Sequence, residues 1–140
     1  MIVMAIDYGD AHTGVAISDP TGFLAGSATT IHSRKAEVVL EELNRLVQAH
    51  KVEELVMGFP RNMDGTEGPR AQLYRDFAAQ VAQVTGLTPV LWDERRTTVD
   101  AHRILFDSGK NAKKRKQTVD AVAASLILEG YLDFKRRQRG

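Results

Sequence analysis

The sequence predicts one α/β domain in which a mixed β-sheet is covered by helices on both faces. Three apolar segments on short connections open the chain, at 2–7, 15–18 and 24–31, and they predict an antiparallel meander of strands. After residue 33, helical and strand-like spacings of apolar residues alternate, which is typical of strands that run parallel to the first one. The length of 140 residues fits a single domain, 1–140.

The individual elements follow from apolar spacing and from residues that start or stop helices. The first segment is apolar until it ends at Asp7, as expected of a central strand buried on both faces. The predicted elements after the meander are a helix with Ser33 as its N-cap, a strand at 55–59, a helix from Pro69 to a Gly86 cap, a strand at 90–92, a helix from Thr97 or Thr98 to about Ser108, and a last helix at 119–132.

Two further expectations concern the middle of the chain. The polar segment 61–68 follows a strand end, and we expect it to be a mobile loop that closes over a substrate. The next helix should bury the stripe formed by Leu73, Phe77, Val81 and Val84.

The composition excludes several classes of protein. With 43% apolar and 26% charged residues, the chain resembles a soluble globular protein and not a disordered or fibrous one. It has no cysteine, so disulfides and thiolate metal sites are excluded, and this fits a reducing cytoplasm. The N-terminal segment lacks a basic region, and no apolar run approaches the roughly 20 residues of a membrane helix. We therefore expect a cytoplasmic protein without membrane contact.

Basic residues are clustered, although the net charge is only +1. Such clusters can neutralise the phosphates of a nucleic acid. Taken alone, the runs at 113–116 and 135–139 favour a simpler interpretation, a solvated loop and a frayed tail. Combined with the carboxylates described next, the clusters predict nucleic-acid contacts at Arg95, Arg96, Lys113, Lys114, Arg115 and Lys116.

Acidic residues stand at the ends of predicted elements, where burial is costly unless something compensates it. Asp7 ends the first strand, Asp93 and Glu94 follow the fifth, and Asp120 lies in the first turn of the last helix. Ligand sites in open α/β sheets collect at the carboxyl ends of parallel strands, so these acids can meet at one edge. Each acid also has an ordinary interpretation: a turn start at Asp7, ion pairs with Arg95 and Arg96, or a helix N-terminus at Asp120.

Three carboxylates that meet at one place need positive charge between them. Clusters of oxygen ligands suit Mg²⁺ or Mn²⁺, and two such ions about 3.5–4 Å apart can clamp the two oxygens of a phosphodiester displacement. The chain offers no nucleophile constellation, and its four histidines are scattered without the spacing of a metal motif.

Four blocks of sequence resemble, in order, the motifs of one bacterial family. They are IDYGDAHTGVAISD at 6–19, MGFPRNMDGTEG at 57–68, DERRTT at 93–98 and KQTVDAVAASLILEGYLD at 116–133. These blocks resemble the Holliday-junction-resolvase-like proteins, also described as pre-16S rRNA nucleases, of the ribonuclease H superfamily. Four ordered blocks that span nearly the whole chain are a specific signal, whereas an isolated DxG is a weak one.

The resemblance implies a ribonuclease-H-like fold with five strands in the order 3-2-1-4-5. It also implies a metal-dependent nuclease that uses Mg²⁺ or Mn²⁺, acts on RNA or on branched or single-stranded DNA, and takes part in maturing the 5′ end of 16S rRNA. Its catalytic, metal-binding acids correspond to Asp7, Glu94 and Asp120 here, with Asp93 as a further possible ligand. The chain departs from the family by having Ala11-His12 in place of a Lys-Arg pair and Arg96 in place of Leu. These departures put substrate preference in doubt more than chemistry.

Three other functions fit parts of the sequence. A resolvase of four-way DNA junctions would use the same chemistry and would differ by recognising shape, with a dimer presenting two sites; both a monomer and a homodimer are compatible with the sequence. The segment DYGDAHTGVA also resembles the first phosphate loop of actin-like ATPases and sugar kinases, but those proteins need two such domains. A non-catalytic nucleic-acid-binding module is the third, and acids at a buried edge argue against it.

Overall fold

The computed structural model describes residues 1–22, 25–60, 68–93 and 112–139, without the side chains of 25, 112–120 and 139. Segment 61–67 and the helix expected after residue 97 lie outside these residues. A five-stranded sheet forms the centre, in the order β3-β2-β1-β4-β5, which confirms the order implied by the resemblance. Its strands are β1 (Val3–Asp7), β2 (His12–Ser18), β3 (Ala25–His32), β4 (Glu54–Phe59) and β5 (Val90–Asp93). The first three strands are antiparallel, and β1, β4 and β5 are parallel.

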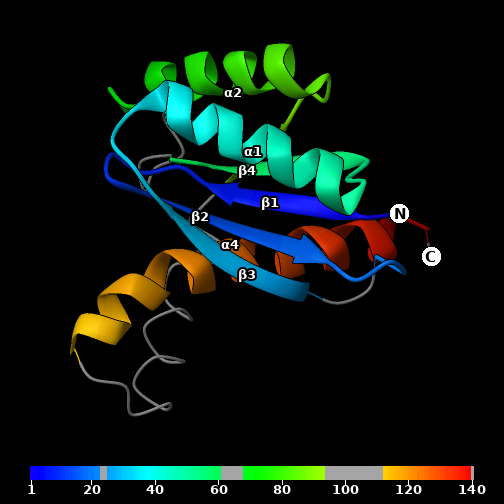
Figure 1. The fold of residues 1–140 in the computed structure, drawn as a ribbon. Coiled ribbons are helices and arrows are strands. Elements are labelled where there is room, and N and C mark those ends of the chain that lie inside the picture. The colour runs from blue at the N-terminus through cyan, green and yellow to red at the C-terminus, as the bar shows by residue number, and fades with distance from the viewer. Residues whose placement is uncertain (23–24, 61–67, 94–111, 140) are drawn as a thin grey trace.

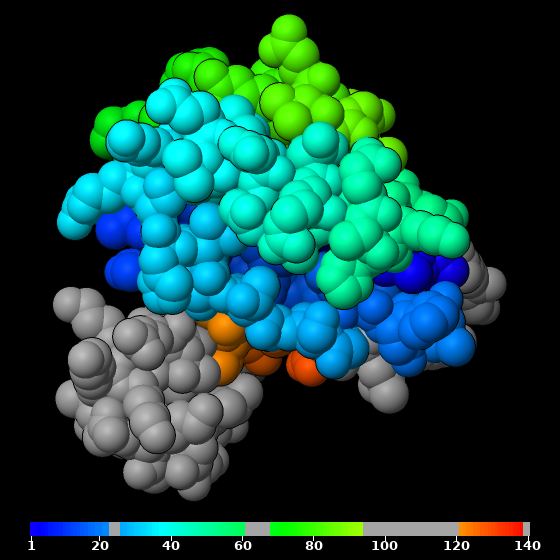
Figure 2. Space-filling model, viewed as in Figure 1, coloured from blue at the N-terminus to red at the C-terminus, as the bar shows by residue number. Residues whose placement is uncertain are grey.

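Helices cover both faces of this sheet (Figure 1). Helices α1 (Ala36–His50) and α2 (Ala71–Thr85) lie side by side on one face, and α4 (Ala112–Arg139) crosses the other. The space-filling view shows α1 and α2 as a continuous layer over the sheet (Figure 2). In the described part of the chain, no helix combines the length and apolar character that crossing a membrane would take.

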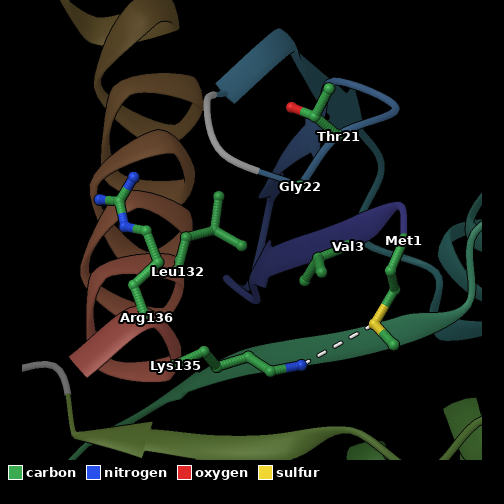
Figure 3. A pocket seen from close by; sticks show the side chains of 7 residues that line it. All are labelled: Met1, Val3, Thr21, Gly22, Leu132, Lys135 and Arg136. Atoms are coloured by element: carbon green, nitrogen blue, oxygen red, sulfur yellow. Dashed lines mark hydrogen bonds between the residues drawn. The ribbon is translucent and has the colours of Figure 1, made fainter. Parts of the chain in front are cut away.

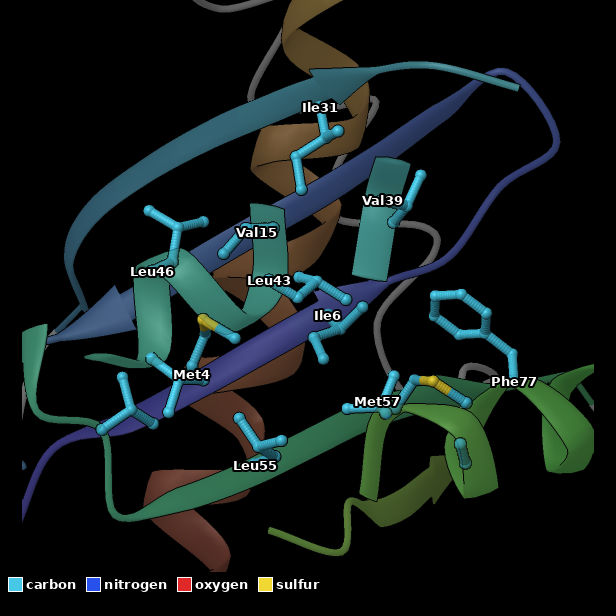
Figure 4. Packing of buried hydrophobic residues seen from close by; sticks show 14 of the residues in the cluster. Met4, Ile6, Val15, Ile31, Val39, Leu43, Leu46, Leu55, Met57 and Phe77 are labelled. Atoms are coloured by element: carbon cyan, nitrogen blue, oxygen red, sulfur yellow. The ribbon is translucent and has the colours of Figure 1, made fainter. Parts of the chain in front are cut away.

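The central strands are buried on both faces because alternate side chains enter two separate cores. In β1, Met4 and Ile6 pack in the core beneath α1 and α2 (Figure 4), whereas Val3 and Ala5 pack against α4. This two-sided burial explains why the first segment is apolar without interruption. It also assigns each residue of the sheet to one face, and the functional site depends on that assignment.

The helix ends differ from the sequence prediction at one terminus and agree at another. Ser33 is not the N-cap of α1: Lys35 holds that position, and the Ser33 hydroxyl instead accepts a hydrogen bond from the Lys35 N–H at 3.1 Å. This local turn uses the serine before the helix starts. Gly86 does end α2 in the left-handed conformation, with φ of 80°, which is the conformation that glycine adopts without steric cost.

The buried face of α2 was predicted only in part. Phe77 and Val81 are buried, but Leu73 and Val84 are 44% and 42% exposed. The helix is rotated so that Tyr74 faces the sheet, where its ring meets Tyr8 edge-on at a centroid distance of 5.6 Å. Aromatic packing therefore decided the rotation, which apolar spacing alone leaves ambiguous.

The last helix is longer than predicted at both ends, because it spans Ala112–Arg139 and not 119–132. The basic run 113–116 thus lies within its helical backbone and not in a loop, and the C-terminal run is helical as well. Lys, Arg and Gln are good helix formers, which an apolar pattern does not detect. Arg136 and Arg137 also pair with Asp133 at 3.5 and 3.1 Å, at spacings that support a helix.

Candidate active site

Asp7 is the last residue of β1 and is half-buried. Because side chains alternate along a strand and Ile6 enters the core below α1, Asp7 is on the opposite face, the one that α4 crosses. It thus stands at the carboxyl end of a parallel strand, where ligands of open α/β sheets bind. This is the position that the sequence predicted for it.

Glycines flank Asp7 on both neighbouring strands. On β2, the directly paired residue is Gly14. On β4, the pairing of Ile6 with Met57 makes Gly58 the next residue in register, level with Asp7. Neither glycine places a side chain beside Asp7 on the α4 face. Glycines at these two positions are compatible with a ligand that approaches the carboxylate closely.

The turn that follows Asp7 is held by α2. The Tyr8 ring stacks on Phe77 with centroids 3.8 Å apart and an interplanar angle of 9°. The Tyr74 hydroxyl donates a hydrogen bond to the Tyr8 carbonyl at 2.8 Å. A Cβ on Gly9 would lie 2.5 Å from the His12 carbonyl oxygen, so this close approach requires glycine. The turn after Asp7 is therefore held by α2 on one side and by the close approach of Gly9 to His12 on the other.

An exposed ion pair adds a further tie between this turn and α2. The Arg70 guanidinium donates a hydrogen bond to Asp10 at 3.0 Å. This hydrogen bond is the largest of the effects that raise the pKa of Arg70. The two side chains are 49% and 66% exposed, so water and salt screen the pair and it contributes little to stability. Asp10 is thus an acid of the same turn that points to solvent.

Asp93 ends β5 but lies on the other face of the sheet from Asp7. Trp92 packs in the core against α4, so the alternation turns Asp93 toward the α2 side. Its register partner is Phe59, which belongs to the core beneath α1 and α2. At the β5 edge of the sheet, Asp93 lines a hollow of about 450 Å³ that Arg75 of α2 and Tyr131 and Phe134 of α4 also line. The described residues therefore do not bring Asp93 to Asp7.

The direction of α4 follows from two contacts near its end. Tyr131 and Lys135 both donate hydrogen bonds to Glu54, the first residue of β4 and the register partner of Val3. In Figure 1 the red end of α4 lies beside the N-terminus, and the orange part extends toward the opposite end of the sheet. The helix thus runs from the carboxyl end of β1 to its amino end.

This direction allows a simple comparison of lengths. From Tyr131 back to Asp120, an α-helix advances about 16 Å. From Val3 to Asp7, a strand advances about 13 Å. The backbone of α4 at Asp120 therefore lies toward the carboxyl end of β1.

The remaining predicted site residues are not described. Glu94, Arg95 and Arg96 lie outside the described residues, as do the side chains of Asp120, Lys113, Lys114, Arg115 and Lys116. Within the described part, no group of three or more acidic or histidine side chains could hold a metal ion. The meeting of three carboxylates stays a prediction.

Two histidines that appear scattered in the sequence are brought together by the sheet. His12 and His32 are direct register partners on β2 and β3, and their Nδ1 atoms are 2.9 Å apart. Nothing in the spacing of the sequence indicates this contact. Only the register between the two strands, which includes a shift at Ile17 and Ser18, brings the two residues opposite one another.

A small hollow at the amino end of β1 lies away from this site (Figure 3). It measures about 80 Å³, and Lys135 reaches across it toward the Met1 sulfur at 3.8 Å. It is lined by Val3 and Leu132 among others and is at the opposite end of the strand from Asp7. This hollow is not part of the candidate site.

Solved structures define the class of fold. The chain is similar to Thermus thermophilus RuvC bound to a Holliday junction substrate, with a TM-score of 0.59, 12% identity, and coverage of 97% of this chain and 96% of that one. It is also similar to the Fowlpox virus resolvase in complex with Holliday junction DNA, with a TM-score of 0.60, 12% identity, and coverage of 96% and 99%. At such low identity the likeness concerns the fold alone, which is the ribonuclease-H-like fold.

The family follows from sequence. The chain belongs to the family described as "RuvX: Holliday junction resolvase", whose family model matches residues 1–134. A relative from Carboxydothermus hydrogenoformans is 44% identical over 137 residues, 98% of this chain and 99% of the relative. Another from Halothermothrix orenii is 45% identical over 141 residues and covers both chains completely. Both relatives carry the name "Putative pre-16S rRNA nuclease".

Proposed function

We propose that this chain is a metal-dependent nuclease that hydrolyses phosphodiester bonds in precursor 16S rRNA, in the maturation of its 5′ end. The observation that carries the proposal is the position of Asp7: a half-buried carboxylate at the carboxyl end of β1, flanked by glycines on both neighbouring strands. The name shared by relatives at 44% and 45% identity supports RNA as the substrate. We place the reaction in the cytoplasm, which fits a chain without cysteine.

The donor set suits Mg²⁺ or Mn²⁺, because carboxylate oxygens are the ligands that these ions prefer. Asp7, Glu94 and Asp120 would hold one or two ions, and the glycines level with Asp7 on both neighbouring strands fit that role. We leave Asp93 out of this set, because its position in the sheet points it to the other face. When bound, such ions make a water molecule more acidic and neutralise charge that develops on the phosphate.

The other residues bind and orient the substrate. Tyr74 and Phe77 hold the turn after Asp7, so the carboxylate keeps a fixed direction. Arg95, Arg96 and the basic run 113–116 would contact phosphates beside the scissile bond. Contacts to the backbone position a nucleic acid without reading its sequence.

The alternative function is cleavage of four-way DNA junctions. It is supported by the description of the family and by two structural neighbours that were solved with Holliday junctions. The chemistry would be the same, and a resolvase would act as a homodimer that presents two sites to one junction. A monomer that cleaves linear RNA would contradict this alternative.

The test is a cleavage panel with precursor rRNA, single-stranded RNA, single-stranded DNA and four-way junctions, each with Mg²⁺, Mn²⁺ or EDTA. We expect cleavage of precursor rRNA with either ion and none in EDTA. Asp7→Asn keeps the shape of the side chain and removes its charge, so it should abolish cleavage and retain most binding. Asp10→Asn is the matched control, because Asp10 lies in the same turn but points to solvent. Wild-type cleavage rates for Asp7→Asn would refute the proposal.

A second experiment tests the basic run 113–116. Replacing its four residues with Ala should weaken binding about equally for different sequences and leave cleavage of bound substrate intact. For each phosphate that the variant no longer neutralises, the plot of log affinity against log salt should flatten by roughly 0.7–0.9. Unchanged affinity and slope would mean that this run does not touch the substrate.

A further inference from the structure

The side chains of His12 and His32 form a pair on the surface of the sheet. Their Nδ1 atoms are 2.9 Å apart and the rings are nearly perpendicular, at 83°. His12 is half-exposed and His32 is exposed, so their outer edges can meet a ligand. At 2.9 Å the inner nitrogens must share a proton, because one nitrogen has to donate and the other accept.

The pair lies on the same face of the sheet as Asp7. Gly14 is directly opposite Asp7, and His12 is two residues along the same strand, so it lies on the same side. Neighbouring strands are about 4.8 Å apart, and a strand advances about 3.3 Å per residue. The Cα atoms of His12 and Asp7, one strand and two residues apart, are therefore roughly 8 Å from each other. His32 follows on the next strand. A nucleic-acid strand at Asp7 would therefore pass within reach of the pair.

The shared proton determines what the pair offers on its outer side. When the pair is neutral, one Nε2 carries a hydrogen and the other presents a lone pair, which repels an anion. When the pair takes up one proton, the inner hydrogen bond persists and both Nε2 atoms carry hydrogens. The pair then presents two outward donors and one positive charge, the combination by which an arginine binds a phosphate. A second proton would break the inner bond.

We propose that His12 and His32 together form a phosphate-binding site for a nucleic-acid strand, active when the pair holds one extra proton. The inference rests on the proposed function for its substrate and adds a phosphate-binding group on the β2–β3 side of Asp7. It also identifies a residue pair that can replace fixed positive charge beside Asp7.

Two pairs of charged side chains near the histidines, among those that the structure describes, bind each other. Glu42 and Arg45 belong to α1, which covers the opposite face of the sheet; they line a shallow hollow with His32 at the β3 edge and form an ion pair at 2.8 Å. On the turn before His12, Asp10 is bound by Arg70. Asp7 lies on the same face as the pair, and Arg34 is the nearest basic residue after His32 in the sequence.

The test measures binding of a fluorescein-labelled single-stranded RNA in EDTA, at about pH 6 and about pH 8, on either side of the range in which imidazole changes charge. We expect wild-type affinity to be roughly tenfold higher at the lower pH, the effect of one additional charge-assisted hydrogen bond. In the double variant His12→Gln and His32→Gln, RNA affinity should no longer depend on pH. At the lower pH its plot of log affinity against log salt concentration should be flatter than that of the wild type by about 0.7. His50→Gln is the matched control, because His50 is exposed at the end of α1, and it should behave as wild type.

A restoring variant and a direct readout complete the design. His12→Arg in the His32→Gln background should bind tightly at both pH values, because its charge is permanent. Titrating the wild-type chain with inorganic phosphate should shift the Nε2 resonances of His12 and His32 in ¹⁵N spectra, and not that of His50. Circular dichroism of each variant establishes that the fold is kept.

The outcomes separate this inference from the proposed function. A chain that binds RNA in this pattern but cleaves nothing would contradict the nuclease and support the phosphate site. A chain that cleaves RNA while the double variant keeps the wild-type ratio of affinities would contradict the phosphate site and support the nuclease. Absence of any pH dependence in wild-type binding would also overturn the inference.

Discussion

Replacing Tyr74 with Phe removes one hydroxyl and keeps the ring that packs against Tyr8. The hydroxyl donates a 2.8 Å hydrogen bond to the Tyr8 carbonyl, and the Tyr74 side chain is only 6% exposed. The loss includes the hydrogen bond and the cost of leaving the carbonyl poorly solvated, so we expect the free energy of unfolding to fall by about 1–2 kcal/mol. With an unfolding entropy of about 2.1 cal/mol/K per residue, the melting temperature should fall by roughly 3–7 °C.

The assay is a thermal melt followed by circular dichroism, together with cleavage measured well below the melting temperature. Because the hydroxyl holds the turn after Asp7, cleavage by Tyr74→Phe should fall several-fold while the protein is still folded. Asp76→Asn is the control on the same helix: Asp76 accepts a hydrogen bond from the exposed Gln72. Its effect on stability should stay within about 0.5 kcal/mol. A melting temperature of Tyr74→Phe equal to that of the control would refute the role of the hydroxyl.

Three further predictions test the structure. Gly86→Ala should lower the free energy of unfolding by about 1–2 kcal/mol through backbone strain alone, since φ is 80° and an added Cβ meets nothing within 4 Å; a melt unchanged from wild type would contradict this. Burial and then the hydrogen bond to Glu54 raise the pKa of Tyr131, so folding favours the neutral phenol. The contribution of Tyr131 to stability should be constant below about pH 10 and be lost above it, and Tyr131→Phe should flatten this alkaline fall in urea titrations at high pH. Mg²⁺ or Mn²⁺ at tenfold its dissociation constant should raise the melting temperature by roughly 5 °C, an increase that Asp7→Asn should lose; equal shifts in both chains would place the ions elsewhere.

The kinds and the order of the described elements could be predicted because local spacing carries that information. The segment that became β1 is apolar without a break, since its side chains enter two cores. Gly86 could be predicted as the end of α2 because a helix commonly ends in a left-handed backbone conformation, which glycine adopts easily. The position of Asp7 at a strand end was equally local, and the structure placed it on the face that α4 crosses.

Helix boundaries were less predictable where apolar spacing was the guide. Helix α4 extends through basic residues on both sides of its apolar centre, because Lys and Arg propagate a helix whatever they contact. The rotation of α2 was set by Tyr74 meeting Tyr8, a contact between residues 66 positions apart. Apolar residues at Leu73 and Val84 were compatible with another rotation, and the sequence contains no local signal that separates the two.

The sequence by itself determined the class of fold, the single acid that ends the central strand, and the family to which the chain belongs. Only the tertiary structure decided which residues meet across strands. A slip of one residue between β2 and β3 would send His32 to the other face of the sheet and abolish its contact with His12. The same alternation separates Asp93 from Asp7, although both residues end parallel strands. Local spacing specifies what each segment becomes, whereas register and packing, which depend on the whole chain, specify which side chains act together.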